Sequence, residues 1–385
     1  MANKLTKKDL EYLQSLPLDL KIKKTELRIR EWYEYWGGDV YVAFSGGKDS
    51  TVLLDIVRRI YPNIEAVYVD TGLEYPEIKS FVKQYKNITI LKPEHSFKYI
   101  LSNYGYPVIS KDIARTIDSV RNFIYKRILT ENNYVKYQLD ILEKWVSDNI
   151  LPMPVQDKTN PEYGKPETPI PLENSGITSY VASLLGLLCK DRMLMWRMPR
   201  NNRSTYNKSK WRWMLNSDFK ISDKCCLYMK KRPIRLYEKS TKKKGIIGTT
   251  AEESGTRLRT WLKYGCNIFS GVKHSMPMSF WTEQDVYEYI YTKKLPICSV
   301  YGDIEREENG KYHTTKCSRT GCVFCMFGAQ MEDEPNRFQR LSVTHPKLYN
   351  YCMNGGQYNE DGWWQPNSEG LGIRHVMDFI GIKTK

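Results

Sequence analysis

Short apolar runs alternate with helically spaced segments along the first hundred residues. Residues 40–44 form a run of β-favouring or small apolar side chains, and apolar positions then recur at helical spacing over residues 51–60. Residues 64–69 and 88–91 repeat the strand pattern, with a helix expected over residues 76–85 between them. Strands that alternate with helices at this interval predict an α/β fold with a parallel, doubly wound sheet.

Polar residues stand where the first two strands end. The first strand runs into Ser-Gly-Gly-Lys-Asp-Ser at residues 45–50, and the second ends at Asp70. Ligands of doubly wound sheets bind at the carboxyl ends of the strands. Both segments are therefore expected at one crevice.

The glycine-rich loop at residues 45–50 has the features of an anion site. Its glycines let the backbone curl with its N–H groups inward, and the following helix adds unpaired amides and the positive end of its dipole. Such a nest binds phosphate or sulfate. The common P-loop has four residues between its first glycine and its Gly-Lys pair, a spacing that this loop lacks. The simpler alternative is a turn with Lys48 and Asp49 as solvated charges.

The string Ser-Gly-Gly-Lys-Asp-Ser resembles the PP-loop of the ATP pyrophosphatases, which include the phosphoadenosine phosphosulfate (PAPS) reductases. Three further segments are similar to that family: residues 70–77, residues 105–112 with Gly-x-Pro-x-x-Ser-Lys, and residues 248–257 with Gly-x-x-x-x-x-Ser-x-x-Arg. Residues 70–77 alone would equally suit a helix N-cap region ahead of a proline. The family often has an arginine where this chain has Thr249, so one phosphate contact is expected to be missing or supplied from elsewhere.

The resemblance implies a set of roles around an adenine nucleotide, either ATP or PAPS. The residues expected to bind the nucleotide are Ser45, Gly46, Gly47, Ser50, Asp70, Thr71, Gly72, Gly248 and Ser254. Those expected to act in catalysis, mainly by electrostatic positioning of a leaving pyrophosphate or sulfate, are Lys48, Asp49, Ser50, Lys111 and Arg257. If ATP is the nucleotide, Mg²⁺ should bridge its phosphates, with Asp49 as a candidate ligand.

Four cysteines resemble the ligand set of the iron–sulfur branch of this family. Adjacent cysteines at residues 225 and 226 are followed 96 residues later by a Cys-x-x-Cys pair. Four thiolates suit a [4Fe-4S] cluster, and by resemblance its ligands are Cys225, Cys226, Cys322 and Cys325. The spacing of Cys317 also matches a plant-ferredoxin arrangement, so Cys317 could replace one of the adjacent pair. Zinc is the alternative metal.

The remaining cysteines bear on the reaction. Sulfonucleotide reductases end in a Glu-Cys-Gly-Ile/Leu-His motif whose cysteine attacks the sulfate sulfur, and this chain has no such string. Cys352 is the later cysteine, and it is expected to be buried rather than nucleophilic. Cys189, Cys266 and Cys298 are expected to be core residues.

Composition and charge limit the partners. Net charge is +15 over 385 residues, a field that attracts polyanions or phosphorylated small molecules. Residues 196–213 interleave aromatics with cations, which suits either stacking on nucleic-acid bases or half-buried anchoring. No apolar run is long enough to span a bilayer and no export signal is evident, so we expect a cytoplasmic protein without a membrane partner.

Five segments are predicted. They are an N-terminal helical segment (1–36), a PP-loop nucleotide-binding core (37–120), an insertion that could contact substrate or nucleic acid (121–218), the remainder of the PAPS reductase-like domain with its cysteines (219–330), and a C-terminal segment (331–385). The favoured function is adenylation of an acceptor by ATP, followed by sulfur transfer that uses the cluster and a sulfur or electron donor protein. Nucleic acid is a candidate acceptor. The alternatives are a sulfonucleotide reductase that makes sulfite and a non-catalytic, zinc-stabilised nucleic-acid-binding protein.

Overall fold

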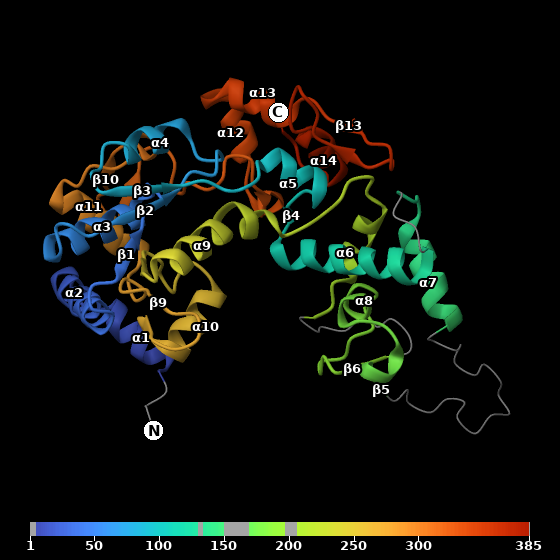
Figure 1. Ribbon diagram of the computed structural model, residues 1–385, viewed down its shortest axis with the longest axis horizontal. Coiled ribbons are helices and arrows are strands. Elements are labelled where there is room, and N and C mark those ends of the chain that lie inside the picture. Colours follow the sequence, from blue (N-terminus) through green and yellow to red (C-terminus); the bar gives the residue numbers. More distant parts are fainter. Residues whose placement is uncertain (1–4, 130–133, 150–168, 197–205, 385) are drawn as a thin grey trace. The chain divides into compact units, whose positions relative to one another are not determined.

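The computed structural model describes residues 5–129, 134–149, 169–196 and 206–384. These residues form two compact units, each built from two stretches of the chain (Figure 1). Unit 1 comprises Met1–Ser96 and Tyr228–Val323, and unit 2 comprises Phe97–Leu227 and Phe324–Lys385. The division into five segments stays a prediction.

Two helices precede the sheet of unit 1, as the sequence predicts. α1 (Lys7–Gln14) begins at a capping box in which Thr6 and Asp9 satisfy each other's amides. Pro17, which lacks an N–H, separates it from α2 (Leu18–Tyr35). Both helices present apolar residues to the main core of the unit.

The central sheet of unit 1 has six strands in the order β3-β2-β1-β7-β9-β8 within the described residues. All neighbours are parallel except β8 and β9, which confirms the predicted α/β class. The strands are β1 (Val40–Ala43), β2 (Ala66–Val69), β3 (Ile88–Leu91), β7 (Lys244–Ile247), β8 (Asn267–Ile268) and β9 (His274–Ser275).

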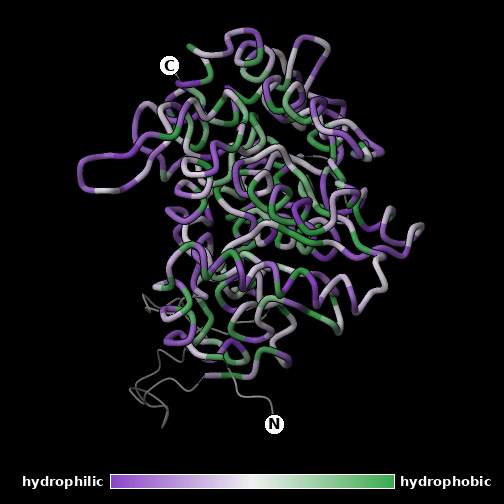
Figure 2. The backbone as a smooth tube through the Cα atoms, turned by 90° about the vertical axis from the view of Figure 1, so that its left-hand side faces the viewer, coloured by the Kyte–Doolittle hydropathy of each residue, from purple (hydrophilic) through white to green (hydrophobic). Residues whose placement is uncertain are grey.

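Alternation along the strands gives the sheet two covered faces. Val40 and Val42 point into the main core, which α2, α3 (Lys48–Ile60) and α11 (Glu283–Lys293) cover. Tyr41 points to the other face, where it packs with Tyr237 of α9 (Arg232–Thr241). Both faces are therefore covered. Figure 2 colours the chain by the hydropathy of each residue, and hydrophobic residues are concentrated in its interior.

The remaining elements of unit 1 are short helices and one hairpin. α3 begins at Lys48, three residues before the predicted start, because Gly47 acts as its N-cap. α4 ends at Val82, three residues before the predicted end. The elements are α4 (Pro76–Val82), α10 (Gly255–Tyr264), η5 (Ser299–Tyr301), and the hairpin of β10 (Ile304–Arg306) and β11 (Tyr312–Thr314).

Unit 2 is mostly helical. A short parallel ladder joins β4 (Val108–Ile109) to β12 (Met326–Phe327). The helices are α5 (Phe97–Asn103), α6 (Lys111–Phe123), η1 (Ile124–Leu129), α7 (Gln138–Asn149), η2 (Leu172–Ser175), α8 (Ser179–Leu184), η3 (Ser209–Asn216), η6 (Ala329–Met331), α12 (Arg337–Thr344), α13 (Pro346–Met353) and α14 (Ile373–Phe379). Two further ladders pair β5 (Ile170–Pro171) with β6 (Leu194–Met195) and β13 (Gln357–Tyr358) with β14 (Trp364–Gln365). The chain returns to unit 1 through η4 (Leu227–Lys231).

One buried arginine organises the interior of unit 2. The Arg121 guanidinium donates to the carbonyl oxygens of Phe219 at 2.6 Å and Ser217 at 2.8 Å, and it lies over the ring of Trp363 at 5.0 Å. It therefore ties α6 to the loop after η3, because a buried guanidinium needs several acceptors. Within the described residues, no helix is long and apolar enough to cross a membrane.

Candidate nucleotide site

The loop after β1 closes on its own hydroxyl groups. The Ser45 amide donates to Ser50 Oγ at 3.2 Å, and the Gly47 amide donates to Ser45 Oγ at 3.3 Å. Ser50 Oγ in turn donates to the carbonyl oxygen of Gly47 at 2.9 Å. The loop is therefore folded before a ligand arrives, with its amides and hydroxyls at the N-terminus of α3, where the helix dipole favours an anion.

Gly46 holds the sharpest turn of the loop. Its φ is +71°, a conformation that L side chains rarely adopt. A Cβ atom there would also lie 2.9 Å from the side chains of Ile78 and Val82 in α4. The loop consequently needs glycine at this position for two separate reasons.

The loop lies where the strand order reverses. The chain runs from β1 to β2 and β3 on one side, and β7 pairs with the other side of β1. Ligands bind at such switch points, outside the carboxyl ends of the strands. Gly248, directly after β7, approaches so closely that a Cβ atom would lie 3.0 Å from the carbonyl oxygen of Asp49. The predicted Gly248 thus borders the loop.

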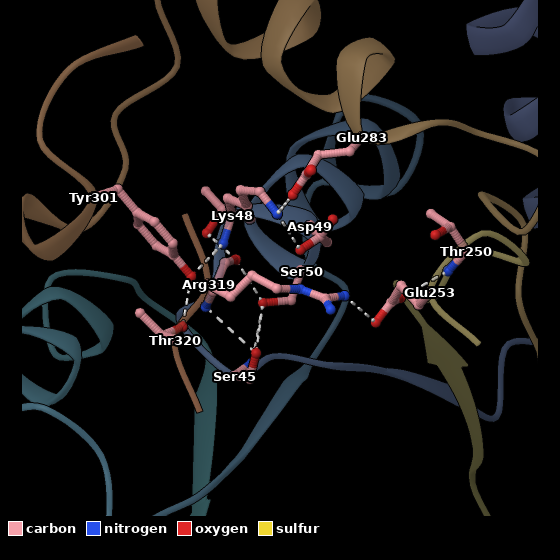
Figure 3. Close-up of polar contacts among 12 residues, drawn as sticks. Ser45, Lys48, Asp49, Ser50, Thr250, Glu253, Glu283, Tyr301, Arg319 and Thr320 are labelled. Atoms are coloured by element: carbon pink, nitrogen blue, oxygen red, sulfur yellow. Dashed lines mark hydrogen bonds and ion pairs between the residues drawn. The ribbon is translucent and has the colours of Figure 1, made fainter. Parts of the chain in front are cut away.

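A segment far along the chain reaches the same loop. The Lys48 amide donates to the hydroxyl of Tyr301 at 3.2 Å, and that hydroxyl lies 2.6 Å from Thr320 Oγ1 (Figure 3). Tyr301 is 2% exposed. Burial raises the pKa of Tyr301 to about 12, so its hydroxyl stays protonated at neutral pH. The neutral hydroxyl therefore joins the Lys48 amide to Thr320 at the loop.

The Lys48 ammonium sits between two carboxylates. Its Nζ lies 3.3 Å from Asp49 Oδ2 and 3.1 Å from Glu283 Oε1, and it lies over the ring of Tyr287 at 5.3 Å (Figure 3). The lysine side chain is 5% exposed, whereas that of Glu283 is 46% exposed. Lys48 and Asp49 are therefore not the solvated charges of a simple turn.

Two arginines share one glutamate at the edge of the loop. Arg257 pairs with Glu253, and Arg319 Nη2 lies 3.3 Å from Glu253 Oε2. The Thr250 amide fixes Glu253 from the other side, at 3.0 Å. Burial lowers the pKa of the Arg257 guanidinium, as does the charge of Arg319, whereas Asp49 opposes the shift.

Residues of two predicted nucleotide-binding segments also form hydrogen bonds and ion pairs within the protein. Ser254 is the N-cap of α10, with its Oγ accepting from the Arg257 amide at 3.3 Å. Thr71 donates through its amide and its hydroxyl to Glu74, at 3.1 and 2.7 Å. The Asp70 carboxylate pairs with Lys79 at 2.7 Å. Partial burial opposes ionisation of Asp70, but hydrogen bonds from Lys79 and the Gly72 amide lower its pKa overall.

The cysteines of unit 2 flank β4. Tyr106 forms a parallel bridge with Ile221, four residues before Cys225, and β12 begins directly after Cys325. The thiols of Cys225 and Cys226 lie 3.9 Å apart. The fourth candidate ligand, Cys322, belongs to unit 1, and the predicted Lys111 is the first residue of α6 in unit 2. Across the described residues, no group of three or more His, Cys, Asp and Glu side chains is arranged to hold a metal ion.

Other cysteines and aromatics of the sequence have structural roles. Cys352 is fully buried, and burial raises the pKa of its thiol. Cys189, Cys266 and Cys298 are buried core residues, as predicted. Trp213 packs against Phe379 with ring centroids 5.4 Å apart, which favours its anchoring role over base stacking. The aromatic–cationic stretch also includes residues 197–205, which lie outside the described residues.

Sequence reasoning missed Tyr301, Arg319, Thr320, Glu253 and Glu283 as parts of this site. Tyr301 is the last residue of the short 3-10 helix η5, and Arg319 and Thr320 lie on irregular chain after the β10–β11 hairpin, so none of them belongs to a periodic pattern. The sequence contained one weak indication of such residues. This chain has Thr249 where the family often has an arginine, which suggests that another cation supplies the contact.

Comparison with known proteins identifies the family. The phosphoadenosine phosphosulfate reductase domain matches residues 39–115 and 192–327, more than half of the chain. The chain therefore belongs to this family. The matched residues include the glycine-rich loop, Asp70, Lys111 and all four candidate metal ligands.

Individual relatives are distant and match in part. An adenosine 5′-phosphosulfate reductase of Geobacillus kaustophilus is 33% identical over 123 residues, which is 30% of this chain and 52% of that protein. A phosphoadenosine 5′-phosphosulfate reductase of Alkalilimnicola ehrlichii is 30% identical over 98 residues, 24% of this chain and 40% of that protein. An uncharacterized protein of Methanocaldococcus jannaschii is 28% identical over 138 residues, 32% of this chain and 33% of that protein. The chain thus spans about a third to a half of these relatives.

A solved structure was also compared. The phosphoadenylyl-sulfate (PAPS) reductase of Candida auris, in complex with phosphate, covers 77% of this chain and 90% of its own, with 11% identity and a TM-score of 0.31. A TM-score this low does not establish a common fold, so membership of the family stands on the sequence match.

Proposed function

We propose that this protein is a sulfonucleotide reductase-type enzyme that binds adenosine 5′-phosphosulfate or its 3′-phosphorylated form at the loop of residues 45–50. The observation that carries the proposal is the anion cradle at the switch point of the sheet, where Ser45, Ser50 and the Lys48 amide meet the protonated hydroxyl of Tyr301. The family match and the named reductases among the relatives support the same substrate class.

The proposed reaction breaks the bond between sulfur and the phosphate oxygen. A thiolate attacks the sulfate sulfur, and the nucleoside phosphate leaves with the bonding electron pair. The first thiol now carries a sulfonate group. A second thiolate attacks the sulfur atom of that first thiol, the sulfur–sulfur bond breaks, sulfite leaves with the bonding electron pair, and the two thiols remain joined as a disulfide. The loop and its cations stabilise the charge on the leaving group, and a dithiol protein supplies the electrons.

Cys352 does not suit the role of the attacking thiol. It is fully buried and its pKa is raised, whereas the attacking species must be an accessible thiolate. This observation favours a second candidate function, in which ATP adenylates an acceptor and sulfur then displaces AMP. The phosphates would occupy the same loop, and Asp49 would help to hold Mg²⁺, which would stabilise the charge on the phosphates. A nucleic-acid acceptor gains no support from the relatives or from Trp213.

The two candidates release different products. Anaerobically purified protein would be given adenosine phosphosulfate, its 3′-phosphorylated form or ATP, each with a dithiol reductant, and sulfite, AMP and pyrophosphate would be measured. Sulfite that depends on the sulfonucleotide and survives in Cys352→Ala supports the reductase. If ATP gives pyrophosphate and neither sulfonucleotide gives sulfite, the reductase proposal is wrong and the adenylating function takes its place.

We also propose that Cys225, Cys226, Cys322 and Cys325 bind a metal centre. The donor set consists of thiols, and the 3.9 Å between the first two also suits one tetrahedral zinc ion, since 2.3 Å zinc–sulfur bonds place two ligands about 3.8 Å apart. A [4Fe-4S] cluster would supply electrons or tune the field of the site, whereas zinc would only stabilise the fold. Iron, sulfide and zinc content of the anaerobic protein distinguish them. Near-stoichiometric iron and sulfide are expected, and zinc without sulfide would exclude the cluster.

A further inference from the structure

We propose that Arg319 is a specificity-determining residue of the nucleotide site. Together with Arg257, and held by the same glutamate, it would form a paired-guanidinium subsite for the second anionic group on the 5′-phosphate of the nucleotide. The inference rests on the proposed function, because it assumes that a nucleotide occupies the loop of residues 45–50.

The backbone of Arg319 is anchored on one side of the loop. The neighbouring Thr320 Oγ1 lies 2.6 Å from the Tyr301 hydroxyl and 3.7 Å from the position of a Cβ atom at Gly47. Cys317 Sγ donates to the carbonyl oxygen of Arg319 at 2.8 Å. Residue 319 therefore follows the loop closely and is not part of a remote surface.

The guanidinium of Arg319 ends on the other side. It meets Glu253, whose other carboxylate oxygen accepts from the Thr250 amide just beyond Gly248. Gly248 itself packs against the backbone of Asp49. The side chain thus connects a segment beside Gly47 to Glu253 on the Gly248 side of the loop, and Figure 3 shows its ion pair with Glu253. A ligand on the loop would meet this side chain.

Two cations compete for one carboxylate at Glu253. Arg257 and Arg319 both pair with it, so these three side chains carry one net positive charge, which the nearby Asp49 carboxylate partly offsets. Proximity of Arg319 contributes to the lowered pKa of Arg257, which shows that the two cations repel each other. An anion between them would relieve that repulsion. The Arg319 side chain is 62% exposed, so it retains N–H donors that face solvent.

This geometry distinguishes nucleotides by the number of anionic groups on the 5′-oxygen. Adenosine monophosphate has one such group, which the loop itself can bind. Adenosine phosphosulfate and adenosine diphosphate each carry a second one, and paired guanidinium groups recognise sulfate and phosphate oxygens alike. The alternative is that Arg319 makes only an exposed ion pair with Glu253, which would contribute little to stability or to nucleotide binding.

Calorimetric titration of the full chain with adenosine phosphosulfate, adenosine diphosphate and adenosine monophosphate tests the proposal. Arg319→Gln is expected to weaken binding of at least one of the first two by about tenfold or more, because a charge-assisted hydrogen bond is lost. Binding of the monophosphate should stay within about twofold. The ligand that responds, sulfate or phosphate, identifies the group that Arg319 contacts.

Arg259→Gln is the matched control. Arg259 lies two positions further along α10, is exposed, and donates to Thr256 Oγ1 at 3.4 Å, so the variant removes the same charge without reaching the subsite. The proposal is overturned if Arg319→Gln leaves all three affinities unchanged, weakens all three equally, or acts no more strongly than Arg259→Gln. A wild-type chain that binds none of the three nucleotides would instead remove the proposed function, and with it this inference.

Discussion

At the residue scale, Gly46 and Gly72 form a natural pair of test positions. Both have positive φ, +71° and +77°, but a Cβ atom would clash with α4 only at Gly46. Gly72→Ala should cost about 1–2 kcal/mol in the free energy of unfolding from backbone strain alone. Gly46→Ala should cost a further 1–3 kcal/mol or so from overpacking and should abolish nucleotide binding. Urea denaturation and calorimetry measure both effects, and equal losses in the two variants would contradict this account of the loop.

Buried ion pairs are expected to affect the free energy of unfolding much more than exposed ones when one partner is removed. Lys21 and Asp285 are nearly inaccessible, with the ammonium 2.7 Å from each carboxylate oxygen. They join α2 to α11, on the face of the sheet that carries α3. Lys21→Met leaves the Asp285 carboxylate buried without its cation, so we expect a loss of about 3–5 kcal/mol in unfolding free energy.

The control for Lys21 is on the same helix. Arg28 pairs with Glu31 at 2.7 Å, and both side chains are more than a third exposed. Arg28→Met should therefore change stability by about 1 kcal/mol or less. The double variant Lys21→Met, Asp285→Asn should recover part of the loss, because it removes both charges and leaves an amide oxygen that can still accept from the Thr282 amide at the start of α11. A Lys21→Met protein as stable as Arg28→Met would show that the buried pair has no net role.

At the scale of elements, one carboxylate links η3 to the C-terminal elements. Asp218 accepts hydrogen bonds from His375 of α14 at 2.9 Å and from the hydroxyl of Tyr358 of β13 at 2.6 Å. Partial burial opposes ionisation of Asp218, but these hydrogen bonds lower its pKa overall. The folded state therefore favours the ionised form of Asp218.

This linkage predicts a pH dependence with a definite sign. The folded pKa of Asp218 lies below the unfolded value of about 3.9, so its contribution is complete above that value and is lost as pH falls through the folded pKa. Asp218→Asn should lower unfolding free energy at pH 7, and the gap to wild type should close below about pH 4. Urea denaturation between pH 2.5 and 7 measures it. Asp378→Asn, an exposed carboxylate on α14, should show no such gap.

At the scale of the whole molecule, net charge predicts weak and unspecific attraction to polyanions. A charge of +15 should give measurable binding to duplex DNA at low salt, which falls steeply with log salt concentration and is indifferent to sequence. Fluorescence anisotropy of labelled duplexes between about 50 and 300 mM salt measures it. Sequence-specific binding that persists at the higher salt would instead revive a nucleic-acid acceptor.

Local sequence predicts the α/β fold and the glycine-rich loop of the site, but not the residues that reach the loop from far along the chain. The strand, loop and helix at residues 40–60 are predictable because their signals are contiguous: an apolar run, two glycines, then helical spacing. Tyr301 and Arg319 are not predictable in this way. They reach the loop from some 250 residues away. Tyr301 ends a single short 3-10 turn and Arg319 lies on irregular chain, so the neighbouring residues have no periodicity that indicates which way the two side chains face. The context of Cys352 predicts a buried cysteine, and the structure confirms the burial.

The interleaving of the two units has a consequence for synthesis of the protein. Unit 1 needs both its first 96 residues and residues 228–323, and β7, Glu253, Tyr301 and Arg319 all lie in the second stretch. At about 5–20 residues per second, a ribosome needs roughly 10 to 40 seconds to go from β1 to β7 and roughly 14 to 55 seconds to go from β1 to Thr320. Until β7 is made, β1 has one unpaired edge, which is open to association with other chains. The nucleotide site stays incomplete until Thr320 is made, so we expect chaperone demand to be highest in that interval.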